Sequence, residues 1–274
     1  MTLLITGAAG QLGSLIIQTL DGKVPAGQVI AGVRNLDQAT LALDKGMQVR
    51  LTDYDRPDTL ASAFEGVEQV LLISSSHTDD ELRLQQHNRV IAAAKTAGVK
   101  HLLYTSFAFP PKGPIPTNHV HMLTEQAILA SGLEYTMLRN ALYIDFVGVL
   151  GMDEAIRSGE LRTPPGAWRF NSVTRKDLAG GIAAVLSSAG HRNQIYELTA
   201  PAAWTFTDLA TSLSELAGKP VVHREDPNIQ HWIYPFMSKL DTSSTSDRLV
   251  QLLEGPVTGL TESIRPLLQG SEFL

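Results

Sequence analysis

The chain has 274 residues, of which 43% are hydrophobic and 18% charged, the composition of an ordinary globular protein with a large core. Its formal net charge of -6, with scattered basic residues, argues against a nucleic-acid-binding surface, and the absence of cysteine excludes disulfides, thiolate metal sites and cysteine nucleophiles. Because no apolar stretch approaches the length of a membrane span and residues 1–20 lack a signal-peptide pattern, we expect no membrane partner and a cytoplasmic protein, either a monomer or a homodimer.

The first predicted elements are a strand, a glycine-rich turn and a helix at the N-terminus. A short apolar run, LLIT at residues 3–6, leads into GAAGQLG and then into the helical pattern SLIIQTL. This order predicts a dinucleotide site, since the turn exposes backbone N–H groups and the helix N-terminus adds positive partial charge. A glycine triplet alone is weak evidence, but a second strand, VIAGV at residues 29–33, follows at the distance of a βαβ unit.

Each glycine of the triplet has a predicted role. Gly7 permits a sharp chain reversal, Gly10 lets the backbone approach a phosphate without an intervening Cβ, and Gly13 lets the helix pack closely on the sheet. The expected cofactor contacts of this turn are Gly7, Ala8, Ala9, Gly10, Gln11, Leu12 and Gly13.

Further short apolar runs alternate with helical patterns along the first 200 residues. The runs cover residues 47–52, 69–74, 101–106, 135–140 and 195–200, and the helical periodicity is strongest over 80–98, where Leu82, Val90, Ile91 and Ala94 are expected on one face. Such alternation predicts an α/β fold with a doubly wound parallel sheet, as in Rossmann-type NAD(P)-binding proteins. Ligands of such sheets bind beyond the carboxyl ends of the strands.

The domain organisation follows from a loosening of this pattern after residue 140. We expect a dinucleotide-binding domain over 1–140, to which 168–198 return, including a helix over 176–187. A smaller substrate-binding lid is expected from 141–167 and 199–274. Within it, Thr205 and Asp208 have capping-box spacing at the start of a helix that ends at Gly218.

The residues that end the second and third predicted strands indicate the type of dinucleotide. Arg34 stands where an NAD-specific protein usually has an acidic residue, and a guanidinium suits the 2′-phosphate of NADP. The alternatives are a solvated surface arginine and an NAD-type role for the nearby Asp37. Asp53 could bind near the adenine or equally form a turn.

Two hydroxyl clusters end the fourth and fifth predicted strands. The first consists of Ser74, Ser75 and Ser76, and the second of Thr105 and Ser106. Serines in loops often serve only turn formation, but clusters at neighbouring strand ends point toward one cleft. We therefore expect both to contact the cofactor.

With these residues placed, the sequence resembles the atypical short-chain dehydrogenase/reductase superfamily and its NmrA-like group, which includes triphenylmethane reductases and type-two NAD(P)H:quinone oxidoreductases. The matching stretches are TGAAGQLG, VRN, AAAKTAGVKHLLYTS, HVHMLTEQAI, YTMLRNALYIDF and NSVTRKDLA, from residue 1 to about 200. The resemblance implies that NADPH is bound by the glycine turn, Arg34, the serines at 74–76 and the segment after the sixth strand. This adds Arg139, Asn140, Ala141, Leu142, Tyr143 and, from NSVTR, Arg175.

One departure from the wider superfamily bears on the reaction. Many of its members use a Tyr with a Lys four residues later, and none of the six tyrosines here has a Lys at that spacing. Reduction of a simple ketone forms an alkoxide with a pKa of about 16, which needs a positioned proton donor. A quinone instead yields a phenolate with a pKa of about 10, and a cationic dye needs no proton. The sequence therefore favours hydride transfer from NADPH to a planar conjugated acceptor, a quinone or triphenylmethane dye.

Aromatic residues are the candidates for the acceptor pocket. Phe107, His121 and Phe146 are expected to line it, with His121 and Tyr143 as catalytic candidates, although His121 could also only satisfy a helix end. Trp168 and Trp232 are either remote parts of the lid or core residues. A metal site at His119 and His121 is not expected, because residues two apart on a helix point to opposite sides and no nearby acid completes a ligand set.

Two other functions remain open. Some NmrA-like proteins bind the dinucleotide without turnover and act as redox sensors that regulate a partner, a role that the glycine turn and Arg34 would serve equally well. A sugar-nucleotide epimerase ranks last, since it too needs a Tyr/Lys pair. A substrate cavity beside the nicotinamide would distinguish a reductase from a sensor.

Overall fold

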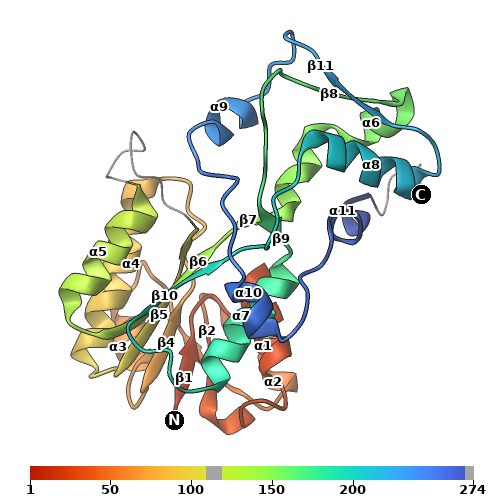
Figure 1. Ribbon diagram of the computed structural model, residues 1–274. Coiled ribbons are helices and arrows are strands. Elements are labelled where there is room, and N and C mark those ends of the chain that lie inside the picture. The colour runs from red at the N-terminus through yellow and green to blue at the C-terminus, as the bar shows by residue number, and fades with distance from the viewer. Residues whose placement is uncertain (109–118, 269–274) are drawn as a thin grey trace.

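The fold is built around one parallel sheet, shown in Figure 1. The computed structural model describes residues 1–108 and 119–268. Seven strands lie in the order β10-β6-β5-β4-β1-β2-β3, and all neighbours run parallel. Their bounds are β1 (Leu3–Ile5), β2 (Val29–Val33), β3 (Gln48–Leu51), β4 (Gln69–Leu72), β5 (His101–Phe107), β6 (Glu134–Asn140) and β10 (Gln194–Leu198). The predicted doubly wound Rossmann-type sheet is confirmed.

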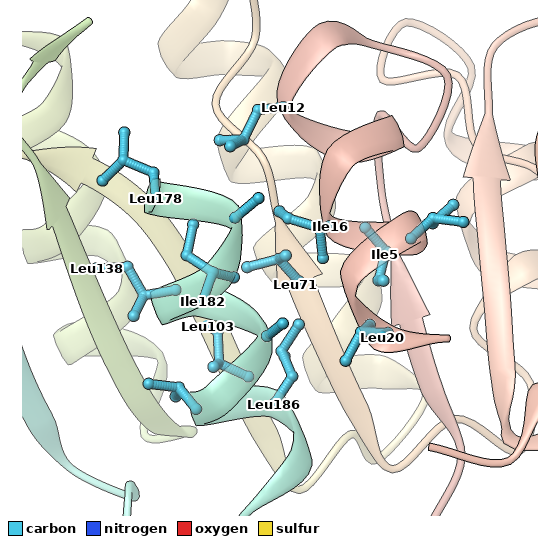
Figure 2. Packing of buried hydrophobic residues seen from close by; sticks show 14 of the residues in the cluster. Ile5, Leu12, Ile16, Leu20, Leu71, Leu103, Leu138, Leu178, Ile182 and Leu186 are labelled. Atoms are coloured by element: carbon cyan, nitrogen blue, oxygen red, sulfur yellow. The ribbon is translucent and has the colours of Figure 1, made fainter. Parts of the chain in front are cut away.

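Helices cover both faces of this sheet, because alternate strand residues point to opposite sides. Leu3 and Ile5 pack on one face with α1 (Gln11–Leu20) and α7 (Arg175–Ser187), while Leu4 packs on the other. Figure 2 shows side chains of α1 and α7 converging over Leu71 and Leu103. The second face carries α3 (Pro57–Ala63), α4 (Asp80–Thr96) and α5 (Val120–Ser131); η1 (Ala26–Gln28), η2 (Leu36–Gln38) and α2 (Thr40–Asp44) complete the connections around β2.

One predicted core residue of α4 is exposed. Val90, Ile91 and Ala94 are buried as expected, but Leu82 is 43% exposed. The polar His87, which is fully buried, lies on the inner face of the helix. Apolar periodicity cannot predict that a polar side chain, here His87, is buried on the inner face of a helix.

A second group of short elements has its own hydrophobic cluster and lies at the top of Figure 1, away from the N-terminus. It contains η3 (Ile144–Leu150), α6 (Met152–Ser158), β8 (Glu160–Thr163), α8 (Phe206–Ala217), β11 (Val222–Glu225), α9 (Ile233–Met237) and α11 (Leu260–Leu268). The predicted capping box of Thr205 and Asp208 begins α8, and Gly218 ends it with φ +63°. A short parallel pair, β7 (Leu142–Tyr143) with β9 (Ser172–Val173), lies between this region and the large sheet.

The division into a cofactor domain and a lid stays a prediction, and two details of the packing bear on its boundaries. Trp168 and Phe170 pack in the second cluster, although 168–198 was assigned to the cofactor domain. Conversely α10 (Arg248–Leu253) packs on α7, with Leu249 in the first cluster. Residues 269–274 of the predicted lid lie outside the described residues. No helix in the described part of the chain is long and apolar enough to cross a bilayer.

Candidate functional site

The glycine turn after β1 lies at the point where the strand order reverses. The chain runs from β1 outward to β3 and then crosses to β4 on the other side, which leaves a crevice beyond the carboxyl ends of β1 and β4. Tyr54 ties these ends together, because its hydroxyl donates to the carbonyl of Ile73 at 2.8 Å and contacts Thr6 Oγ1. No sequence motif marked Tyr54 for this role.

The glycines fix the conformation of the turn. Gly7 has φ +62°, a left-handed conformation that glycine adopts at low cost. A Cβ on Gly13 would lie 2.3 Å from the carbonyl oxygen of Gly7 and 2.8 Å from Cα of Ala8. Gly13 is therefore required by close contact with the turn itself, rather than by packing of the helix on the sheet as expected from the sequence. At Gly10 a Cβ would be tight, at 3.2 Å from the same oxygen.

The N-terminus of α1 lacks the side-chain cap that α4, α7 and α8 have. Asp79, Thr174 and Thr205 accept hydrogen bonds from backbone N–H groups at the starts of α4, α7 and α8. The N-cap of α1 is Gly10, which has no side chain to do so. Uncapped N–H groups at a helix start attract anions such as a pyrophosphate.

Arg34 directly follows β2 and is exposed beside this turn. The Ala8 N–H donates to the Gly32 carbonyl at 3.0 Å, which places the residue pair Gly32 and Arg34 next to the glycine turn. Within residues 1–108 and 119–268, Arg34 makes no hydrogen bond or ion pair. Asp37 lies in η2, where its N–H donates to Asn35 Oδ1 at 3.0 Å. The free guanidinium fits a phosphate ligand, as the strand-end position suggested.

Asp53 has a local structural contact. Its Oδ1 accepts the N–H of Asp55 at 3.0 Å, which is the turn-forming role that the sequence left open. Asp53 is half-buried. Its predicted contact with the adenine side of the cofactor stays a prediction.

The two hydroxyl clusters are joined, as the sequence predicted from their neighbouring strand ends. The Ser74 N–H donates to Thr105 Oγ1 at 2.8 Å, and Ser75 Oγ donates to Gln86 Oε1 at 2.5 Å. Arg83 of α4 donates two hydrogen bonds to the same loop, from Nε to the Ser75 carbonyl at 3.1 Å and from Nη2 to Ser74 Oγ at 3.1 Å. These bonds fix the backbone of the loop, and Ser76 stays exposed beside it.

His87 is a neutral imidazole that hydrogen-bonds to the loop at residues 74–76. Thr124 Oγ1 donates to the Val120 carbonyl at 2.7 Å, so it accepts the proton of His87 Nδ1 at 2.8 Å. The other ring nitrogen, Nε2, then accepts the Ser75 N–H at 2.9 Å. Burial, reinforced by the charge of Arg83, lowers the pKa of His87 to about 3. Sequence analysis missed both His87 and Arg83.

His121, at the start of α5, has its proton directed into the protein. The guanidinium of Arg83 can only donate, so Nε2 of His121 is the acceptor at 3.3 Å, and Nδ1–H is assigned to Tyr104 Oη at 2.8 Å. Burial, followed by the charge of Arg83 and the neighbouring His119, holds the pKa of His121 well below its ordinary value. The imidazole is therefore neutral at pH 7, and its geometry fits an orienting role better than proton donation.

His119 and His121 are not placed on opposite sides of a helix, as their spacing predicted. His119 is the N-cap residue, with a non-helical backbone, so the two rings lie on the same side. They stack with centroids 5.4 Å apart, and Phe107 lies 6.3 Å from His121. The described residues contain no group of three side chains suited to hold a metal ion.

The segment after β6 contributes backbone and buried amide groups. The guanidinium of Arg139 binds Glu125 at 2.7 Å and Glu197 at 2.9 Å, so its charge is already neutralised. Ser106 Oγ also donates to Glu125, at 2.6 Å. Both amide atoms of Asn140 are buried without a hydrogen-bond partner in the described residues, although the amide lies close enough to affect the pKa of Tyr143. An unpaired buried amide is costly and suits a ligand group.

Tyr143 and Arg175 form a stacked pair beside β7 and β9. The guanidinium carbon lies 4.3 Å from the centre of the Tyr143 ring, and Arg175 also pairs with Asp145. Burial raises the pKa of the Tyr143 phenol, although the charge of Arg175 opposes this. The ring therefore serves to hold Arg175 at the edge of the site.

A small, partly open pocket lies beyond the ends of β5, β6 and β10. It is lined by Phe107, Ala108, Ala141, Leu142, Asn171, Thr199, Asp241 and Ser244. The predicted lining residue Phe107 is present. Five lining residues were not predicted, namely Ala108, Asn171, Thr199, Asp241 and Ser244, and of these Asn171 begins the NSVTR stretch. Phe146 instead stacks on Trp204, with ring centroids 5.9 Å apart, and lies tilted against Phe170 at 5.4 Å. Trp232 is 65% exposed.

Comparison with known proteins identifies the family. Residues 7–189 match the model of an NAD(P)H-binding family. The chain is 41% identical over 220 residues to quinone oxidoreductase 2 of Escherichia coli, covering 80% of this chain and 76% of that protein. It is 30% identical over 222 residues to an NAD(P)H azoreductase of Xenophilus azovorans, covering 80% and 75% of the two chains.

Solved structures agree with this assignment. A triphenylmethane reductase of Citrobacter sp. in complex with NADP(H) superposes with a TM-score of 0.88 at 42% identity, covering 97% of this chain and 100% of that chain. An NADPH-dependent quinone oxidoreductase of Escherichia coli in complex with NADPH gives a TM-score of 0.86 at 35% identity, with the same coverage. The chain therefore belongs to the NAD(P)H-binding family, as its resemblance to the NmrA-like reductases predicted, and is an NAD(P)H-dependent oxidoreductase.

Proposed function

We propose that the protein is an NADPH-dependent reductase that transfers hydride to a planar conjugated acceptor, such as a quinone or a triphenylmethane dye. The observation that carries this proposal is that no described side chain around the pocket is suited to donate a proton near pH 7. Among the described residues that line it, none is an acid that titrates near pH 7. The nearest candidate, His121, is neutral and directs its proton toward Tyr104. An acceptor whose reduced form is stabilised by conjugation does not need such a donor.

The residues present fit the cofactor. The uncapped start of α1 and the Gly7 turn would hold the pyrophosphate, the free guanidinium of Arg34 would bind the 2′-phosphate, and the unpaired amide of Asn140 is available near the strand ends. When bound, NADPH supplies the hydride. The relatives that were solved with NADP(H) or NADPH support the phosphorylated dinucleotide.

The chain's own residues then position the acceptor rather than react with it. Phe107 offers an aromatic face, and the fixed His121 lies beside it. Arg83 holds both His121 and the serine loop, so it couples the acceptor side to the cofactor side. Holding two reactants in line can supply several kcal/mol of the barrier without acid catalysis. In this proposal His121 and Tyr143 are positioning residues.

The test measures NADPH oxidation with 1,4-benzoquinone and malachite green, together with fluorescence titrations of NADPH and NADH. We expect turnover of both acceptors in the wild type. Arg34→Ala removes a charge-assisted contact with the 2′-phosphate, so the dissociation constant for NADPH rises about tenfold or more while that for NADH changes little. Equal losses for both dinucleotides contradict the phosphate assignment.

The redox-sensor alternative predicts a different result. A sensor binds NADPH tightly but oxidises it with no acceptor across a panel of quinones, dyes and ketones. The pocket beside Phe107 favours the reductase, because a sensor needs no cavity for a second reactant. Binding without turnover would support the sensor.

A further inference from the structure

The pocket beyond β5, β6 and β10 is lined by two chemically different groups of residues. The apolar lining consists of Phe107, Ala108, Ala141 and Leu142. The polar lining consists of Asn171, Thr199, Asp241 and Ser244. A flat ring system at this pocket therefore meets apolar side chains as well as a hydroxyl and a carboxylate.

Asp241 is an anion without a counter-charge. Its Oδ1 accepts the N–H groups of Ser243 and Ser244, each at 3.1 Å, and its Oδ2 accepts Ser244 Oγ at 2.6 Å. Partial burial pushes the pKa of Asp241 upward, but these hydrogen bonds outweigh it and hold the pKa below its ordinary value. In the described parts of the chain no Lys, Arg or His side chain pairs with this carboxylate. The charge is thus permanent at pH 7 and locally unbalanced.

The loop that carries Asp241 is held to the cofactor domain. Asn171 Nδ2 donates to the Ser244 carbonyl at 3.0 Å and to the Ala200 carbonyl at 2.8 Å, and Asn171 Oδ1 accepts the Ala200 N–H at 2.9 Å. The Thr242 hydroxyl donates to the carbonyl of Arg169 at 2.7 Å. The buried side-chain amide of Asn171 therefore holds the loop with Asp241 and the segment with Thr199 in fixed positions relative to each other.

Thr199 supplies an independent sign that the polar lining of the pocket receives a ligand. Its side chain is 1% exposed, and Oγ1 has no hydrogen-bond partner in the described residues. Since Thr199 is one of the residues that line the pocket, a ligand group there is the partner that would satisfy Oγ1.

We infer that Asp241 selects acceptors by charge, favouring conjugated rings that carry a positive charge over neutral ones and disfavouring anionic ones, while Thr199 binds acceptors of any charge. This inference rests on the proposed reductase function. The carboxylate attracts a cation through space, and the hydroxyl can bond an uncharged polar atom beside it. The apolar lining supplies ring contact that does not depend on charge, so a neutral quinone still binds but gains nothing from Asp241.

The test uses three 1,4-naphthoquinones that share one redox core and carry a quaternary ammonium, no charge or a sulfonate. Asp241→Asn keeps the acceptor oxygen for the two N–H groups but removes the charge. The kcat/KM of the variant relative to wild type should fall about fivefold for the cationic quinone, stay unchanged for the neutral one and rise about fivefold for the sulfonate. Variant-to-wild-type ratios cancel the intrinsic reactivity of each quinone.

Asp44→Asn is the matched control. It changes the net charge equally, but Asp44 is the last residue of α2, which leads into the amino end of β3, whereas the pocket lies beyond carboxyl ends of strands. All three ratios should remain near one. Thr199→Val should weaken the binding of all three quinones without changing their order, because it removes a hydroxyl and no charge.

A second measurement separates this inference from the proposed function. Calorimetric binding of the three quinones to the protein loaded with NADP⁺ involves no turnover, and it should show the same dependence on charge. If Asp241→Asn alters all three quinones equally in both assays, charge selection by Asp241 is refuted. If no quinone is reduced but the charge-dependent binding remains, the reductase proposal fails while the subsite stands.

Discussion

Gly13→Ala tests whether the close contact in the glycine turn shapes the cofactor site. The new Cβ would lie 2.3 Å from the Gly7 oxygen and 2.8 Å from Ala8 Cα, and these are backbone atoms that cannot rotate away. Overpacking of this kind costs about 1–3 kcal/mol, which the better helix propensity of alanine, about 1 kcal/mol, offsets only in part. The net destabilisation is therefore modest, about 0–2 kcal/mol.

The larger effect should fall on NADPH binding. To relieve the clash, the turn must move far enough to lengthen the 2.3 Å contact beyond 3.0 Å, and this displaces the backbone N–H groups at the start of α1. Loss of one charge-assisted hydrogen bond to a phosphate is worth about 1.5–3 kcal/mol, so the dissociation constant should rise about tenfold or more. Urea unfolding measures the stability, and fluorescence titration measures the binding of NADPH.

Gly27→Ala is the control for adding a methyl group elsewhere, because a Cβ on Gly27 meets no atom within 4 Å. It should leave NADPH binding unchanged. If Gly13→Ala binds NADPH as tightly as the wild type, the turn either is not a pyrophosphate site or tolerates the displacement, and the reasoning from contact distances is wrong.

Two further predictions concern stability. Leu249→Ala should lower the free energy of unfolding by about 2–5 kcal/mol, because Leu249 is fully buried against α7. Leu129→Ala is the control, and it should change this free energy little because Leu129 is 51% exposed. Equal effects of the two substitutions in urea unfolding would contradict the packing of α10 on α7. Because burial lowers the pKa of His87 to about 3, the unfolded chain takes up this proton first, so stability should fall below about pH 6.5 and down to about pH 3, by up to about 1.4 kcal/mol per pH unit. Urea unfolding between pH 7.5 and 5 should show a shallower loss for His87→Gln, and identical slopes would argue against a neutral buried His87.

The large sheet could be predicted because its signals are local. The run at 29–33 coincides with β2, and the run at 101–106 differs from β5 by one residue. These strands are buried on both faces, so each appears in the sequence as a nearly continuous apolar run. The helix expected over 176–187 is likewise one residue shorter than α7, since its cap Thr174 and its apolar periodicity lie within the same short segment.

The pocket could not be predicted, because its walls come from distant parts of the chain. Asp241 and Thr199 are 42 positions apart and are brought together by the amide of Asn171. Local patterns carry no information about such long-range bonds. The stacking of His119 on His121 was missed for a related reason, since the helix boundary decides where each ring points, and boundaries are the least certain part of a sequence-based assignment.

The charges around α5 bear on the absence of a Tyr/Lys pair and on the reaction that we propose. In reductases with a Tyr/Lys pair, a cation one helical turn after the acid lowers the pKa of the phenol. Here the residue four positions after His121 is Glu125, whose carboxylate is bound by Arg139. Burial raises the pKa of the nearby Tyr104, and the hydrogen bonds to Thr124 and Ser74 and the charge of Arg83 offset this rise only in part. Burial therefore keeps the phenol protonated, which supports an acceptor that needs no proton from the protein.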